Sequence, residues 1–156
     1  MEIKIRELEE KDLNESTNLI SRLKRFNAEH DTLFSLTENL EEVVKKYLKD
    51  SIASKDRDAL VAEDNGKIVG IIMVEIIDRL FYKPKNEARI TEIYILPEYR
   101  KKGLGGKLIK EIISRETKKG CMILTVEFPS ENLLAHKFYT GQEMRSIISV
   151  YGKSLK

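Results

Sequence analysis

Residues 100–106, Arg-Lys-Lys-Gly-Leu-Gly-Gly, are the stretch from which the fold of this chain is best deduced. The β-rich run at 88–96 comes before it, and Pro97 ends that run because proline lacks the backbone donor of a ladder. The apolar residues that follow have helical spacing: Leu104, Leu108, Ile109, Ile112 and Ile113. The stretch is therefore predicted to join a strand to the beginning of a helix.

This glycine-bearing loop has the properties of an anion site. A helix N-terminus presents unpaired N–H groups and the positive end of the helix dipole, which suit phosphate. Glycines let the backbone approach an anion closely, and three preceding cations add attraction. The alternative is an ordinary N-terminal turn with solvated charges. A Walker loop is excluded because Lys107 is followed by Leu108, and the dinucleotide fingerprint lacks its third glycine.

The segments on either side of this loop predict a mixed α/β fold. Strands are expected at 2–8, 58–63, 67–77, 88–96, 121–126 and 145–155. Helices are expected at 12–26, 35–52, 104–119 and 132–139. The element order is therefore β-α-α-β-β-β-α-β-α-β, in a predominantly antiparallel sheet with helices on both faces. No linker or repeat interrupts residues 1–156, which we predict to be a single domain.

Composition narrows the classes of function. The net charge of +2 gives no case for nucleic-acid binding. Cys121 is the only cysteine, and His30 and His136 lie far apart with no acidic companion at metal-ligand spacing, so we expect no disulfide and no metal site. Cys121 itself precedes an apolar run and is expected to be buried rather than nucleophilic. No segment has the length of a membrane span or a signal peptide, so we expect a cytoplasmic protein without membrane contact.

At this point the sequence resembles the GNAT superfamily of N-acetyltransferases. Arg100 to Gly105 fit its signature [Q/R]-x-x-G-x-[G/A] at a strand-to-helix junction, after a lead-in that ends in Pro-Glu-Tyr at 97–99. The downstream pattern Asn-x-x-Ala-x-x-Phe-Tyr is present at 132–139. Glu143 and Met144 stand where the family has a Gly-Phe pair, a departure that predicts a different turn after the last helix. The element order is also that of the GNAT fold.

The resemblance implies acetyl-CoA as cosubstrate, without a metal. In the family, backbone amides of the glycine loop hold the pyrophosphate, and the preceding strand pairs with the pantetheine arm like another strand. The Ile95 N–H would polarise the acetyl carbonyl. By position, the cofactor-binding residues are Ile93, Tyr94, Ile95, Arg100, Lys101, Lys102, Gly103, Leu104, Gly105, Gly106 and Asn132.

The implied reaction is direct attack of a primary amine on the thioester. Tyr139 matches the family's tyrosine acid, which protonates the leaving thiolate; the alternative is a tyrosine that packs a short helix against the sheet. An alkylamine with a pKa near ~10.4 must first lose a proton. Glu92 on the central strand is the preferred base, unless it is a partly buried carboxylate paired with Arg89 or a lysine. Glu127 is the reserve candidate.

The acceptor remains open. Glu29, His30, Asp31 and Glu38 place acid near the first helical connection and would attract a cationic amine, although they would equally serve as loop and cap residues. Two hypotheses for the acceptor are a small amine and a protein N-terminus or lysine. A third hypothesis for the function is a non-catalytic acyl-CoA-binding module. Homodimers are common in the family.

Overall fold

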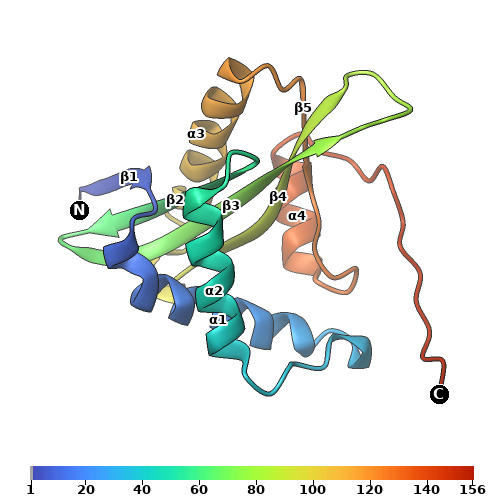
Figure 1. Cartoon of the computed structure of the whole chain (residues 1–156), viewed down its shortest axis with the longest axis horizontal. Helices are drawn as coiled ribbons and strands as arrows, with labels where there is room; N and C mark the ends of the chain where they lie inside the picture. The colour runs from blue at the N-terminus through green and yellow to red at the C-terminus, as the bar shows by residue number, and fades with distance from the viewer. Residues whose placement is uncertain (1) are drawn as a thin grey trace.

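The computed structural model describes residues 2–156 and contains a single five-stranded sheet with four helices (Figure 1). The strands are β1 (Ile3–Glu7), β2 (Arg57–Asp64), β3 (Lys67–Asp78), β4 (Asn86–Ile95) and β5 (Ile123–Val126). The helices are α1 (Leu13–Ala28), α2 (Leu40–Ala53), α3 (Leu104–Lys118) and α4 (Leu133–Gly141). Three short 3-10 turns lie at Glu10–Asp12, Thr32–Phe34 and Pro97–Tyr99. The mixed α/β fold predicted from the sequence is confirmed.

The sheet has the order β1-β2-β3-β4-β5. Its first three pairings are antiparallel, and only β4 and β5 run parallel. The β2–β3 hairpin turns at Asn65 and Gly66, whose φ angles of 50° and 85° are those a tight hairpin turn requires. The β4–β5 pair is parallel because α3 crosses over between the two strands.

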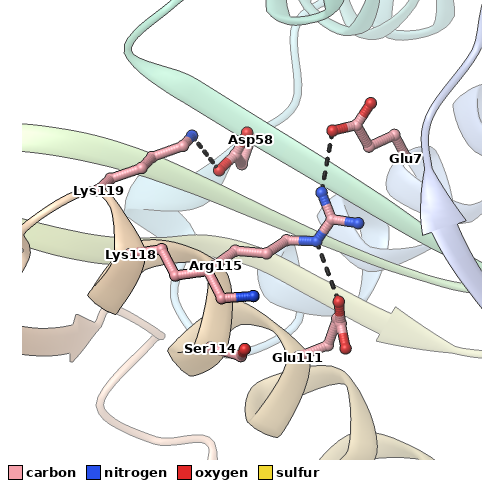
Figure 2. A pocket seen from close by; sticks show the side chains of 7 residues that line it. All are labelled: Glu7, Asp58, Glu111, Ser114, Arg115, Lys118 and Lys119. Carbon is pink, nitrogen blue, oxygen red and sulfur yellow. Dashed lines mark hydrogen bonds and ion pairs between the residues drawn. The ribbon is translucent and has the colours of Figure 1, made fainter.

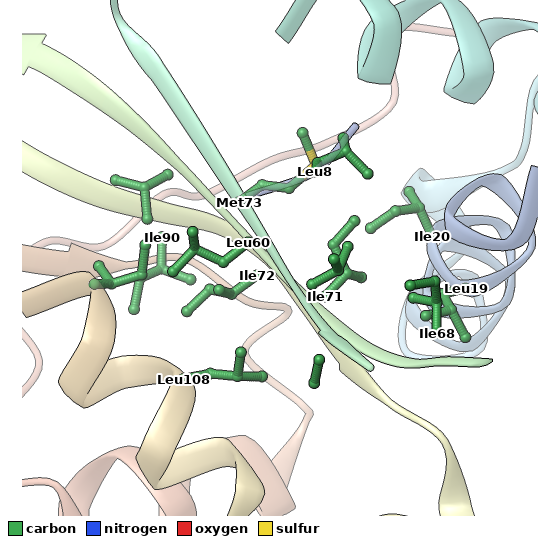
Figure 3. Close-up of a cluster of buried hydrophobic side chains, with 14 of the residues drawn as sticks. Leu8, Leu19, Ile20, Leu60, Ile68, Ile71, Ile72, Met73, Ile90 and Leu108 are labelled. Atoms are coloured by element: carbon green, nitrogen blue, oxygen red, sulfur yellow. The ribbon is translucent and has the colours of Figure 1, made fainter. Parts of the chain in front are cut away.

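Helices α1 and α2 cover one face of the sheet, and α3 and α4 cover the other (Figure 1). Figure 3 shows this core from close by, with Leu19 and Ile20 of α1 and Leu108 of α3 on opposite sides of the strands. Both faces of β3 are therefore covered, and its residues 68–74 are buried without the alternation of a half-exposed strand. The core fixes β3 and β4 as the rigid centre on which the site is built.

One predicted element does not form. Residues 145–155, expected as the last strand, are extended but join no sheet, and α4 is the last regular element. In Figure 1 this segment leaves the body of the molecule and ends far from β5. A strand needs a neighbour to complete its ladder, and within one chain this segment does not meet one.

The turn that ends α4 is well defined, and it corrects a second expectation. Met144 N–H donates to Tyr139 O and Glu143 N–H to Thr140 O, each over 3.0 Å, which together form a Schellman motif. The motif needs a left-handed residue after the C-cap, and Glu143 takes that conformation with φ 62°. The turn is therefore the one a glycine would make, despite the departure from the family pattern.

Candidate active site

The centre of the sheet contains a strand with half of one edge unpaired. β5 pairs with β4 only from Glu87 to Ile90, whereas β3 pairs with β4 along its whole length. From Thr91 to Ile95 the β5 side of β4 therefore has no neighbouring strand within residues 2–156. A free strand edge of this kind accepts an extended ligand through main-chain hydrogen bonds.

The backbone direction along this edge follows from one hydrogen bond. Leu96 N–H donates to Val69 O of β3 over 2.9 Å. Because antiparallel pairing alternates with a period of two, the N–H and C=O groups of Ile93 and Ile95 point to the other side, toward the unpaired edge. The Ile95 carbonyl accepts from Arg100 Nε over 2.8 Å. The amides of Ile93 and Ile95 and the carbonyl of Ile93 remain directed at the gap.

The edge runs directly into the glycine loop. Gly103 caps α3 with φ 79°, a conformation that glycine adopts without strain, and a Cβ there would meet nothing within 4 Å. Gly105 has a different role, since a Cβ there would lie 3.0 Å from the Phe138 ring of α4. Lys101 and Lys102 are exposed. The amino end of α3 is thus open at Gly103 and in close contact with α4 at Gly105.

Arg100 and Leu104 complete the surroundings of the loop. The Arg100 guanidinium lies 5.1 Å from the centre of the Tyr94 ring, while its Nε holds the Ile95 carbonyl. Leu104 is buried and anchors the first turn of α3. A hollow of about 190 Å³ borders the same turn and is lined by Ile3, Tyr99, Lys102, Leu104 and Lys107. Its two lysines give this end of α3 a positive rim.

Glu92 lies on the free half of β4 and faces α1. Its side chain is 10% exposed, and one carboxylate oxygen accepts from Lys24 Nζ of α1 over 2.5 Å. Burial raises the pKa of Glu92 above its usual value and nearby Glu127 adds to the rise, while Lys24 opposes it. Arg89, the other partner weighed for Glu92, is paired with Glu87 instead. Glu92 is therefore a buried carboxylate that already holds one ammonium group.

Tyr139 is almost fully buried in α4. Its ring stacks on Phe128 at 5.4 Å and meets Phe138 edge-on at 5.0 Å. The hydroxyl is inaccessible to water and has no hydrogen-bond partner within residues 2–156. Burial raises the pKa of this phenol well above its usual value, so the group stays protonated. A buried donor without a partner is rare in folded proteins and marks a position where a ligand atom would satisfy it.

The other residues singled out from the sequence have structural contacts. Asn132 is the N-cap of α4 and accepts from Ala135 N–H over 3.1 Å. Asp31 caps the 3-10 turn at Thr32–Phe34, accepting from Leu33 N–H. Cys121 is buried after α3, and burial raises the pKa of its thiol, which does not suit a nucleophile. His30 packs edge-on against Phe26.

A second cavity, of about 400 Å³, lies in a different place (Figure 2). It lies at the carboxyl end of α3, about 20 Å from the glycine loop, since a 15-residue helix rises ~1.5 Å per residue. Ion pairs already join the charged groups around it, including Arg115 with Glu7 and Lys119 with Asp58. Its lining therefore leaves little unsatisfied charge, and it has no contact with β4.

Two side chains of this site were missed from the sequence. Lys24 is separated from Glu92 by 68 residues and lies beside Arg25 on a helix that also carries Arg22, so no local pattern distinguishes it. Phe128 follows β5 in an irregular segment, and its stacking on Tyr139 depends on where α4 docks. Both contacts join elements distant in sequence and become visible only in the folded chain.

A strand edge left unpaired beyond Ile90 runs into a glycine-capped helix, and this arrangement defines the class of an acyl-CoA-dependent acyltransferase. The chain belongs to the acetyltransferase (GNAT) family, whose model matches residues 22–142, and it is an acetyl-CoA-dependent N-acetyltransferase. Residues 2–156 contain no helix with the length and apolar character of a membrane span. They also hold no group of three or more His, Cys, Asp or Glu side chains placed to bind a metal.

Two curated proteins with similar sequences are also described as N-acetyltransferases. An uncharacterized N-acetyltransferase of Archaeoglobus fulgidus is 29% identical over 103 residues, which cover 65% of this chain and 69% of that protein. A second, from Methanocaldococcus jannaschii, is 29% identical over 108 residues, 67% of this chain and 48% of that one. The chain thus aligns with about half the length of the second relative.

Solved structures share the fold at low sequence identity. The aminoglycoside N-acetyltransferase AAC(6')-Iy in complex with CoA superposes with a TM-score of 0.81 at 15% identity, over 98% of this chain and 94% of that chain. A mutant of the BH1408 protein from Bacillus halodurans has a TM-score of 0.86 at 16% identity, covering 98% and 99% of the two chains. A predicted acetyltransferase with acetyl-CoA from Clostridium acetobutylicum gives 0.80 at 14%, covering 99% and 97%.

Proposed function

We propose that this protein transfers the acetyl group of acetyl-CoA to a primary amine of a small molecule, by direct attack in a ternary complex. One observation carries the proposal: the unpaired half of β4 runs from Glu92 to the open amino end of α3. The edge offers main-chain groups for an extended arm, and the helix end offers amides for a diphosphate. A thioester on such an arm would come close to Glu92.

The proposed binding groups follow the same line. Backbone amides of Lys101 to Gly106 would hold the pyrophosphate, with Lys101 and Lys102 adding charge. Ile93 and Ile95 would pair with the pantetheine arm through their outward backbone groups, and Tyr94 would pack beside it. Arg100 would act indirectly, since its Nε holds the Ile95 carbonyl. Asn132 would position α4 rather than touch the ligand, because its side chain is used as a cap.

The acceptor end of the site is supported by the pairing of Glu92 with Lys24. The Lys24 Nζ shows that this carboxylate can hold a primary ammonium, and a substrate amine would take the same position by displacing it. Glu92 would then accept the proton that the amine loses on attack. Tyr139, protonated and without a partner, would donate to the departing sulfur. We further propose the cytoplasm as the location, since that compartment supplies acetyl-CoA.

A panel of amines tests the proposal. The full chain is incubated with acetyl-CoA and one acceptor at a time, and free thiol release is recorded. Polyamines and amino sugars form one arm, and peptides with a free N-terminus or lysine form the other. Faster release with the small amines is the expected result. Release with peptides alone would assign a protein acetylase instead, and tight acetyl-CoA binding without release for any amine would indicate a binding module.

A further inference from the structure

Lys24 lies on the face of α1 that packs on the sheet. Leu13, Thr17 and Ile20 precede it at helical spacing, and all three are buried. The Lys24 side chain continues this stripe, and its Nζ donates to a carboxylate oxygen of Glu92 over 2.5 Å. Lysine is rarely placed toward the interior unless its ammonium group is paired. The fold therefore holds a primary amine against the central strand.

Glu92 lies just beyond the point where β4 and β5 separate. The Glu127 N–H donates to the Ile90 carbonyl over 3.4 Å, and from Thr91 onward the β5 side of β4 is unpaired within residues 2–156. The register between β3 and β4 also shifts by one residue at Thr91. Bulges of this kind redirect nearby side chains and are common beside active sites. Glu92 thus holds Lys24 at the inner end of the gap proposed for the pantetheine arm.

The contact between Lys24 and Glu92 has the chemical parts that acyl transfer requires. A lysine ammonium must lose a proton before it attacks, and Glu92 is within hydrogen-bond reach of that proton. Burial raises the pKa of Glu92, which makes it a better proton acceptor. The Lys24 side chain is 35% exposed and has a flexible four-carbon stem, so its Nζ can swing from Glu92 to an adjacent thioester. Arg22 and Arg25 remain charged guanidinium groups and do not act as nucleophiles.

We propose that Lys24 is an acceptor within the enzyme itself: when acetyl-CoA is bound and no amine substrate occupies the site, the acetyl group passes to Lys24 of the same chain. The transfer rests on the proposed function, since it uses the same thioester position. The product amide is neutral and no longer pairs with Glu92, so each chain would accept one acetyl group.

In this step Glu92 takes one proton from the Lys24 ammonium, and the freed Nζ attacks the thioester carbonyl. A C–N amide bond forms and the C–S bond breaks, with its electron pair leaving on sulfur. Tyr139 donates a proton to that sulfur, and the second proton of the nitrogen returns to the phenol through solvent. The products are acetyl-lysine, the CoA thiol and one proton, which Glu92 releases to water.

A second lysine–carboxylate pair provides a matched comparison. Lys119 Nζ lies 2.5 Å from a carboxylate oxygen of Asp58, the same distance as in the Lys24–Glu92 pair. Lys119 lies at the carboxyl end of α3, far from the glycine loop at its amino end. Reaction caused by a neighbouring carboxylate alone would therefore modify both lysines, whereas transfer from a bound thioester would modify only Lys24.

Peptide mass spectrometry of the full chain tests the proposal. The protein is incubated with trideuterated acetyl-CoA and no amine, so that transferred acetyl groups differ in mass from any acquired during expression. Lys24 should carry one acetyl group, labelled or already present, and Lys119 should stay at the level of a urea-unfolded sample. The rate of labelling should not depend on protein concentration, because the transfer occurs within one chain.

Two variants separate transfer at the site from chemical acetylation. Glu92→Gln removes the base at nearly constant shape and should slow modification of Lys24 roughly 10²-fold. Tyr139→Phe should slow it as well, because the leaving sulfur loses its proton donor. Retained acetyl-CoA affinity, measured by calorimetry, shows that each variant is folded.

An unmodified Lys24 in a chain that releases thiol with an amine would overturn the transfer to Lys24 and leave the proposed function intact. Equal modification of Lys24 and Lys119, or of Lys24 in wild type and Glu92→Gln, would also overturn it. So would a rate that rises with protein concentration, because the transfer would then occur between molecules. A chain that neither binds acetyl-CoA nor releases thiol would refute the proposed function, and the transfer to Lys24 with it.

Discussion

Lys24 Nζ of α1 lies 2.5 Å from a carboxylate oxygen of Glu92 in β4, and this ion pair joins the first helix to the free half of the central strand. The Glu92 side chain is 10% exposed and that of Lys24 35%. The carboxylate is thus largely removed from water while its partner can move outward. The ammonium group of Lys24 favours the charged form of this buried carboxylate, and a cationic ligand would compete with Lys24 for it.

The acid limb of the pH–rate profile should therefore depend on Lys24. Burial raises the pKa of Glu92 and Lys24 lowers it, so removal of the lysine should raise it further. A base must be unprotonated to work, and activity is lost as the pH falls through this pKa. Lys24→Met should move the acid limb of kcat/KM to higher pH.

Lys24→Arg is the matched control, because it keeps the positive charge and should leave the limb near its original position. The same amine is used throughout, so that its own titration cancels in the comparison. An identical limb in wild type and Lys24→Met would mean that Glu92 is not the base.

Tyr139→Phe should separate catalysis from stability. Its hydroxyl has no partner in the described chain, so no hydrogen bond is lost and the unfolding free energy should change by less than about 1 kcal/mol. Turnover should fall roughly 10²-fold if the phenol protonates the leaving sulfur. Acetyl-CoA affinity, measured by calorimetry, should be kept. Tyr151→Phe removes an exposed hydroxyl and should alter nothing; equal turnover in both variants would leave Tyr139 a packing residue.

Gly103→Ala should weaken acetyl-CoA binding about 10-fold, or ~1.4 kcal/mol, because its methyl group would stand in the open mouth of the loop. Gly120→Ala is the matched control: its φ of 92° imposes the same backbone strain, and its Cβ also meets nothing within 4 Å. Both variants should lose about 1 kcal/mol of stability, but only the first should lose affinity. Equal affinities in a titration would remove the loop from the binding site.

Glu143→Gly should stabilise the fold. Glu143 holds the left-handed position of the Schellman turn at φ 62°, which costs a non-glycine residue about 1 kcal/mol. Thermal unfolding should therefore shift upward by a few degrees. Gln142→Gly, one residue earlier at φ −93°, gains no such relief and should be less stable than wild type by roughly 0.5–1 kcal/mol. Destabilisation by Glu143→Gly would show that the side chain itself supports the turn.

Much of the fold could be predicted from the sequence because its signals are local. Apolar residues at helical spacing after Gly103 predicted α3, and Asn65-Gly66 predicted the β2–β3 hairpin. The failed prediction at 145–155 has a physical cause. The residue pattern and the β-propensity of a segment indicate that it is suited to pair as a strand. Whether it pairs depends on where a neighbouring strand lies. The local pattern cannot tell whether that neighbour belongs to the same molecule.

The candidate site, like the fold, could be predicted from the sequence only in part. The glycine loop is formed by consecutive residues, so its position could be predicted from residues 100–106 alone. The role of Gly105 could not be predicted from the sequence, because only the docking of α4 brings Phe138 against it. Glu92 was weighed as a free base or a paired carboxylate, and the identity of its partner required the packing of α1 on β4.

The incomplete pairing of β4 has a consequence for the life of the protein in the cell. A strand edge left open for a metabolite is equally open to any other extended polypeptide, and such edges seed aggregation. Cosubstrate in the gap would shield those backbone groups, and its binding energy would add to folding stability by mass action. The persistence of the protein would then follow the cell's supply of activated acetate, falling in starvation as the unoccupied form accumulates.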